Sequence, residues 1–437
     1  MIRSIFNFQQ KDVVLYEGRC TISVDNINYE GTAQIKSVVL PKVKIVIEAE
    51  FNDHRVAPLI DKSISFSIGN HKIDAMIISS KLQLQPVLSK LKLVSSKNDI
   101  NIILDAKNKV QSIIFHLFNF HDFMDYNKLI RIDNGGYRIS ETTLESSRYN
   151  ITIQSLEETS DNIKVIQEKG ISMLTQMGKI EKSDGTFISI QEYDELENML
   201  VLFFSFTKGS WINPTCPIGI DDNDQRSWYI FNAPKSEWKS LSSWFEPTHN
   251  ALTMSSMKKL FLLFSELWEH ENWQETLREV IYWFINANDG SRGVDTGIIL
   301  AQTALERLSF EYVVNEKKLI SSDGFKKIRA SDKFKLLFSS LGIPLEIPTE
   351  LIPLTKEAKS HQWLDGPHAL TEIRNSLIHP EHKKHAKFNI DIYIDAHKLS
   401  LWYLELSILA ICGFDDVYSN RIKNSIVEDV PYKSMTI

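Results

Sequence analysis

The first 190 residues alternate apolar and polar positions over short stretches, and this pattern predicts a β-rich region. Runs rich in valine and isoleucine, such as "VKIVIEAEF", "SISFSIG" and "NITIQSL", have the period of two that is typical of strands. The run "NIKVIQE" is predicted as a further strand, and turn sequences such as "SIGNHK" and "IDNGG" separate the runs. Short strands with few helices between them favour an antiparallel sandwich or barrel.

The period changes to that of a helix near residue 190. "SIQEYDELENMLVLFFSF" places apolar residues at helical spacing behind a serine start signal, and a Gly-, Pro- and Trp-rich stretch with two predicted strands follows. From Met257 onward the helical spacing predicts an up-and-down bundle with the apolar helix "DIYIDAHKLSLWYLELSILAIC" at its centre. The predicted class is α+β: a β-rich, sandwich- or barrel-like sensing domain at 1–190, a helical and irregular junction at 191–250, and an all-α bundle at 251–437.

Composition and charge narrow the classes of protein that the chain can belong to. The net charge of -7 gives no global attraction to nucleic acid or anionic membrane, so binding of a polyanion requires a local patch. Cys20, Cys216 and Cys412 lack paired spacing, which argues against a disulfide framework and fits a reducing compartment. Without a secretory signal or an apolar run long enough to span a bilayer, the chain is expected to be soluble and cytoplasmic.

Motifs for several common chemistries are missing from the sequence. Neither "GxxxxGK" nor "GxGxxG" occurs, so nucleotide-driven chemistry is not indicated, and no "GxSxG" nucleophile elbow is present. We therefore expect no cofactor.

The stretch "ALTEIRNSLIHPEHKKHAK", residues 369–387, concentrates the side chains that could carry chemistry. Asn375 and His379 are four residues apart and lie on one side of a helix. Arg374 and His379 are five apart, roughly 140° around the axis and about 7.5 Å along it, so one regular helix cannot bring both to one atom. Pro380 disfavours helical geometry at His379, and the dipole at the helix end favours the protonated form of that histidine.

These residues resemble a known family. "EIRNSLIHP" is similar to the Arg-x4-His signature of HEPN-type ribonuclease domains, in which a polar residue, usually Asn, follows the arginine. "LAQTALERL", with Glu306, resembles the first helix of Apea-like HEPN domains, which also carry a β-rich region ahead of their bundle. The resemblance covers about residues 257–420.

The resemblance implies an endoribonuclease that needs no metal. The 2′-OH of RNA attacks the neighbouring phosphate, leaving a 2′,3′-cyclic phosphate and a 5′-OH. Arg374 would stabilise the charge on the phosphate, and His379 would transfer protons. Asn375 would orient the histidine, and Glu306 would hold Arg374 in place, unless it is an ordinary exposed acid.

The resemblance also implies partners and a biological role. Two protomers would join their motif helices in a homodimer, which removes the geometric difficulty of the five-residue spacing. The role would be antiviral defence by abortive infection, with cleavage of tRNA or other RNA restrained at the junction until the N-terminal domain binds a phage protein or ligand. The alternatives are a catalytically inactive HEPN module for RNA binding or dimerisation, and a regulatory scaffold.

Simpler interpretations exist for the same residues. His379 could complement the helix dipole while Arg374 pairs with Glu372 or Glu381 at the surface. A zinc site at His379 and the nearby histidines lacks cysteine partners and is not expected.

Two basic clusters are candidates for substrate binding. Lys326, Lys327 and Arg329 lie in a lysine-rich stretch, and Lys383 and Lys384 follow the motif helix. The alternative for both clusters is a solvated helix face.

Several aromatic residues and two histidines are assigned to the core. Trp268, Trp273, Trp283 and Trp402 are predicted core residues and not base-stacking surfaces. His116 and His121 are predicted to be buried, with a recognition surface as the alternative.

Overall fold

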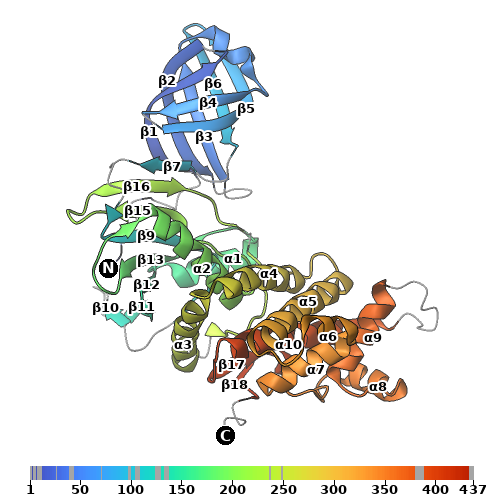
Figure 1. Cartoon of the computed structure of the whole chain (residues 1–437). Helices are drawn as coiled ribbons and strands as arrows, with labels where there is room; N and C mark the ends of the chain where they lie inside the picture. The colour runs from blue at the N-terminus through green and yellow to red at the C-terminus, as the bar shows by residue number, and fades with distance from the viewer. Residues whose placement is uncertain are drawn as a thin grey trace.

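The computed structural model describes residues 2, 6, 12–25, 27–38, 44–69, 71–96, 100–103, 109–123, 129–131, 137–235, 238–247, 250–378 and 388–432. From the N-terminus, the chain forms a closed β-barrel, an eight-stranded sheet and a helical bundle (Figure 1). The predicted α+β class, with a β-rich first half and an α-helical second half, is therefore confirmed.

Six antiparallel strands close into the barrel in the order β1-β2-β3-β6-β5-β4. These strands are β1 (Asp12–Val24), β2 (Ile27–Val38), β3 (Lys44–Phe51), β4 (Ser63–Ile68), β5 (His71–Leu84) and β6 (Val87–Ser95), and the short helix η1 (His54–Leu59) precedes β4. Alternate residues point inward, and Ile22, Phe51, Phe66 and Leu93 are completely buried among them. Side chains thus fill the barrel, as in other small barrels.

The second sheet has the order β10-β11-β12-β13-β9-β15-β16-β7. Its strands are β7 (Ile100–Ile103), β9 (Ser112–Phe118), β10 (Leu129–Arg131), β11 (Tyr137–Glu145), β12 (Tyr149–Ser155), β13 (Leu174–Lys182), β15 (Thr215–Ile220) and β16 (Arg226–Phe231). The short strands β8 (Lys109–Val110) and β14 (Ile188–Ser189) pair beside it. The two strands predicted in the stretch 191–250 therefore exist, and they complete this sheet.

One predicted strand is wrong. "NIKVIQE" belongs to helix α1 (Thr159–Lys169), which packs on β13. Gly170, at φ 64°, ends this helix in the left-handed conformation, and its N–H donates to the carbonyl of Ile166. Ile166 is the one fully buried apolar residue of this helix. The helix therefore lacks a clear apolar face in the sequence, and its alternating polar and apolar residues were interpreted as a strand.

The sheet packs on both of its faces. Ile114 and Phe118 of β9 join the core of the barrel, whereas Phe115 and Leu117 face helix α2 (Ile190–Lys208) and the bundle beyond it. The predicted serine start signal of α2 is confirmed, since Ser189 and Glu192 cap each other's backbone N–H groups.

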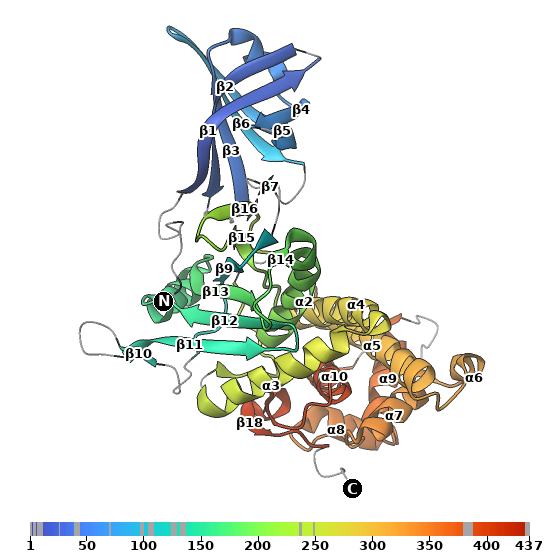
Figure 2. The same cartoon turned by 60° about the vertical axis from the view of Figure 1, so that its left-hand side comes forward.

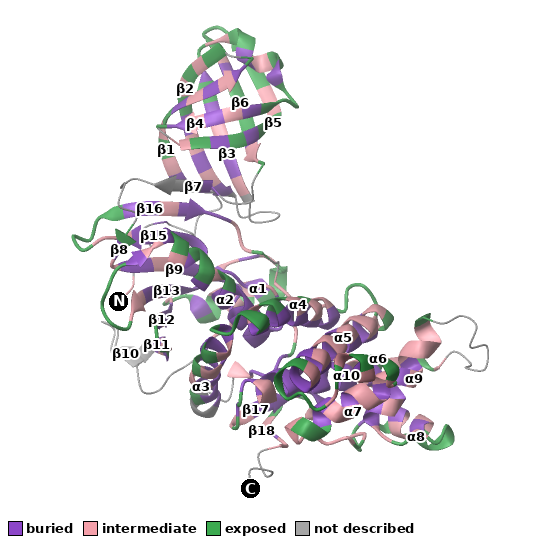
Figure 3. Ribbon diagram, in the orientation of Figure 1, coloured by how far each residue is buried: buried purple, intermediate pink, exposed green. Residues whose placement is uncertain are grey.

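The bundle surrounds helix α10 (Ile390–Ile411), which is buried along most of its length (Figure 3). Its other helices are α3 (Asn250–Trp268), α4 (Glu271–Asn288), α5 (Val294–Ser309), the π-helix η4 (Phe310–Glu316), α6 (Ser322–Lys327), α7 (Ala330–Leu341), α8 (Ile352–Ser360) and α9 (Gly366–Ile378). A hairpin of β17 (Val417–Asn420) and β18 (Ile426–Asp429), with η5 (Arg421–Lys423) between its strands, follows α10. None of the helices in the described ranges is both long and apolar enough to cross a membrane.

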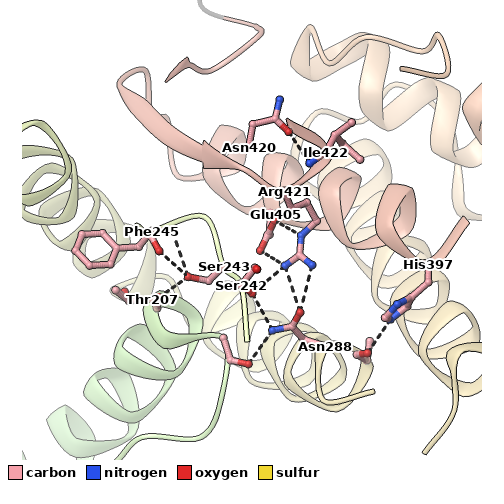
Figure 4. Close-up of polar contacts among 12 residues, drawn as sticks. Thr207, Ser242, Ser243, Phe245, Asn288, His397, Glu405, Asn420, Arg421 and Ile422 are labelled. Atoms are coloured by element: carbon pink, nitrogen blue, oxygen red, sulfur yellow. Dashed lines mark hydrogen bonds and ion pairs between the residues drawn. The ribbon is translucent and has the colours of Figure 1, made fainter. Parts of the chain in front are cut away.

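The bundle is joined to the sheet by packing and by a buried polar network. Helix α3 packs against β11 (Figure 2), and α2 packs against α3 and α4. Arg421 donates to the fully buried carboxylate of Glu405 at 2.7 and 2.5 Å, to Asn288 Oδ1 at 3.3 Å and to the carbonyl of Ser242 at 3.2 Å (Figure 4). Asn288 donates in turn to the carbonyl of Gly209 at the end of α2, so this network fixes the junction.

Candidate RNA-binding site

Helix α9 carries the described part of the motif on a rigid base. Its first residue, Gly366, donates its N–H to the carbonyl of Leu345 and packs so closely on Tyr403 that a Cβ would lie 2.3 Å from the tyrosine Oη. Leu370 and Ile373 are completely buried in the bundle core. The helix is therefore held along its apolar face, and the position of Arg374 follows from it.

Arg374 and Asn375 lie on the last turn of α9, where both are half-buried. The Nε atom of Arg374 is buried, yet it has no hydrogen-bond partner, and no ion pair joins this arginine to Glu372 or any other described residue. Leaving a buried donor unpaired costs about 1–3 kcal/mol and more for a charged group, and native proteins show few such cases. A guanidinium in this state is suited to binding an external anion.

The other members of the predicted site cannot be placed beside Arg374. His379, Lys383 and Lys384, and with them the histidines of the zinc alternative, lie outside the described residues. Glu306 is described, and its carboxylate is 4.0 Å from Lys333 Nζ. Among the described residues, no contact between Glu306 and Arg374 is found, so the expected support of the arginine by Glu306 is not seen.

Lys326, Lys327 and Arg329 are exposed on α6 and just before α7. Lys326 Nζ is 3.7 Å from Asp323, whereas no ion pair of Lys327 or Arg329 is found in the described part of the chain.

Helix α7 supports the start of α9. Helix α7 packs against α9, and Lys335 in its middle binds Asp365, which directly precedes α9. The end of α7 continues to Leu345, which binds Gly366. Both contacts place the start of α9 beside the second half of α7.

Most of the predicted core residues are confirmed, whereas Trp283 and His121 are only half-buried. His116 is completely buried, with Nδ1 2.9 Å from the carbonyl of Thr215, and burial lowers its pKa to about 4. Burial also lowers the pKa of His121 well below its usual value. Trp268, Trp273 and Trp402 are at most 7% exposed, which leaves them no role as open stacking surfaces.

A cleft between the sheet and the bundle was not predicted from the sequence. It has a volume of about 350 Å³, and the turn between β11 and β12 lines it together with α2, α3 and α4. Arg148 and Glu269 face each other there at 3.7 Å although they are far apart in the sequence. No local motif marks such a site, because its residues meet only in the folded chain.

Comparison with known proteins corrects the family assignment. Residues 105–240 match the family model of the YopA central domain, and residues 270–432 match that of the YopA C-terminal domain. The resemblance to Apea-like HEPN domains was therefore wrong: the matched C-terminal model covers the region on which it was based. The Arg-x4-His spacing and the order of β-rich and helical regions were not specific enough to identify a family.

The likeness to YopA extends beyond these two domains. The chain is 27% identical over 427 residues to the SPbeta prophage-derived uncharacterized protein YopA of Bacillus subtilis (strain 168), covering 96% of this chain and 93% of that protein. No solved structure matches the chain. The chain is thus similar to a YopA protein along nearly its whole length, and its two matched regions follow the order of the YopA central and C-terminal domains.

Proposed function

We propose that this protein binds RNA at the end of α9, with the exposed cations of α6 and of the start of α7 as further contacts, and that it cleaves the RNA without a metal. The side chain of Arg374 carries the proposal. Its Nε is buried without a partner among the described residues, so a phosphate oxygen would supply the missing acceptor.

Exposed cations elsewhere in the bundle support an extended polyanion over a small anion. Lys327 and Arg329 are exposed, and a nucleic-acid backbone gains affinity from each phosphate that such residues neutralise. Lys383 and Lys384 would add further positive charge, because they follow the motif helix closely in the sequence. Because the chain has a net charge of -7, its attraction for a polyanion has to come from such basic residues.

The proposed chemistry uses the substrate's own nucleophile. The 2′-OH attacks the adjacent phosphorus, a 2′,3′-cyclic phosphate forms, and the 5′ oxygen leaves with a proton. His379 titrates in the range needed to accept and return that proton. Arg374 stabilises the negative charge that develops on the phosphate oxygens, and Asn375 orients the histidine.

The helix geometry supports a composite site made by two copies of the chain. Positions 374 and 379 of one regular helix are roughly 140° apart around its axis, so a partner copy would supply the histidine that faces each arginine. We expect a homodimer through the end of α9.

The likeness to a prophage-derived protein is in keeping with a role in phage infection. In that role the enzyme would act as a toxin that halts growth by cutting cellular RNA, restrained until the N-terminal part binds a phage protein or other ligand.

The test is induced expression in bacteria, with growth and RNA integrity as readouts. We expect the wild-type chain to slow growth, and both Arg374→Ala and His379→Ala to abolish the effect. Arg226→Ala is the matched control, because it removes one exposed arginine from β16, far from α9 in the sequence. Equal toxicity of all four chains would exclude cleavage at this site.

Purified protein separates binding from cleavage. Fluorescence anisotropy with a labelled single-stranded RNA should show binding that weakens with salt, and Arg374→Ala should lower the salt slope by about 0.7. RNA binding that depends on Arg374 in the absence of cleavage would identify a binding module.

A further inference from the structure

The cleft between the sheet and the bundle has the features of a ligand site. Its volume of about 350 Å³ falls at the small end of the range for sites that hold small molecules. Leu196 and Met199 of α2 give it an apolar side, and Trp268 at the end of α3 adds an aromatic one. Its walls come from both the sheet and the bundle.

A nearly buried tyrosine, Tyr149, lines this cleft, and its backbone is bonded to Ser146. Tyr149 is 6% exposed, and no hydrogen bond of its hydroxyl is found among the described residues. Burial raises its pKa, Arg148 lowers it, and the carboxylates of Glu192, Glu195 and Glu269 raise it further. The phenol therefore lies within the field of these carboxylates, which line the same cleft.

The charges of the cleft are unbalanced. Four carboxylates line it against two arginines, and the set consists of Glu192, Glu195, Glu269 and Glu271 with Arg148 and Arg278. Arg148 is 3.7 Å from Glu269, and Lys182 binds Glu192 from outside the lining at 2.6 Å. Arg278 stacks over the ring of Trp268 at 4.9 Å. In the described part of the chain, Glu195 and Glu271 have no ion pair.

We propose that this cleft binds a small organic cation, with an ammonium or guanidinium group between Glu195 and Glu271 and an apolar or aromatic part against Leu196, Met199 and Tyr149. The unpaired carboxylates provide the attraction for the cation, and the unpartnered phenol provides a hydrogen-bond donor or acceptor. A free amine and an arginine side chain of a bound peptide share this chemistry. The proposal does not depend on the proposed action on RNA.

Isothermal titration calorimetry on the full chain tests the site with three probes. Tyramine carries an aromatic ring and an ammonium group, 4-ethylphenol is the same molecule without its charge, and N-acetyl-argininamide represents a peptide side chain. We expect one of the two cations to bind saturably below about 10 mM, and the neutral phenol to bind at least about fivefold more weakly. Which cation binds better distinguishes a free amine from a peptide side chain.

Variants assign the binding to the cleft. Glu195→Gln combined with Glu271→Gln should weaken the cation at least about fivefold, because each carboxylate contributes a charge-assisted contact. Glu266→Gln is the control, since Glu266 is an exposed acid of α3 that does not line the cleft. Circular dichroism checks that each variant is folded. Absence of saturable binding by either cation, equal binding of 4-ethylphenol, or unchanged binding by the double variant would overturn the proposal.

Discussion

Removing Arg421 should destabilise the protein more than any surface ion pair would. Arg421 is 7% exposed and Glu405 is completely buried, so Arg421→Ala leaves a carboxylate in the core without its cation. Burial raises the pKa of Glu405 even with Arg421 in place, which shows how unfavourable the isolated charge would be there. Breaking a buried pair in this way costs about 3–5 kcal/mol, a large part of the stability of a typical domain.

Urea unfolding followed by circular dichroism measures this loss. The matched control is Lys423→Ala, which breaks the half-exposed Lys423–Glu428 pair of 2.8 Å and should cost at most about 1 kcal/mol. The double variant Arg421→Met with Glu405→Leu should lose much less than the two single changes together, because no buried charge remains. A loss below about 1 kcal/mol for Arg421→Ala would refute the view that this network holds the junction.

Three further changes probe other features of the fold. The unfolding free energy should fall as pH drops from 6.5 toward about 4, because His116 is protonated in the unfolded chain but stays neutral where it is buried in the folded protein. The full effect is about 3 kcal/mol, and His116→Leu should flatten this part of the pH profile. Gly209→Ala should cost about 1–2 kcal/mol or more in thermal unfolding, because Gly209 has φ 76° and a Cβ would lie 2.9 Å from the carbonyl of Ser242. Burial raises the pKa of the Cys20 and Cys412 thiols to about 12, so neither should react with a thiol reagent at pH 8 until the chain is denatured, and fast labelling of the native protein would contradict their burial.

The sequence predicted those elements whose patterns are local. The helix that starts at Ser189 and the apolar helix α10 both follow from spacing and capping residues, and both are confirmed. Helix α1 was missed because its polar and apolar residues alternate as in a strand. Its helical state depends on packing against β13, which the local sequence does not show.

The order of strands in the sheet was beyond sequence reasoning. Strands β15 and β16 lie after α2 in the chain but beside β9 and β7 in the sheet, so the sheet continues past residue 190. Long-range pairing of this kind leaves no periodic signal.

The candidate site was predicted only in part. Arg374 and the exposed cations of α6 and α7 could be picked out by residue type, but the ion pair of Glu306 with Lys333 could not, because it joins α5 to α7 through the fold. The cleft at Tyr149 and the pair Glu405–Arg421 depend on contacts between distant segments and were not foreseen. The motif also resembled the wrong family, since a short spacing on a helix recurs in unrelated bundles.

The most direct test of the proposed function is cleavage of a defined single-stranded RNA by purified protein in the presence of EDTA, with the new ends identified chemically. The account predicts products that end in a 2′,3′-cyclic phosphate and a 5′-OH. It also predicts a rate that falls about 10²- to 10³-fold in Arg374→Ala and at least as far in His379→Ala, while Arg226→Ala cleaves like the wild type. RNA that stays intact, or cleavage that is unchanged in Arg374→Ala, would contradict it.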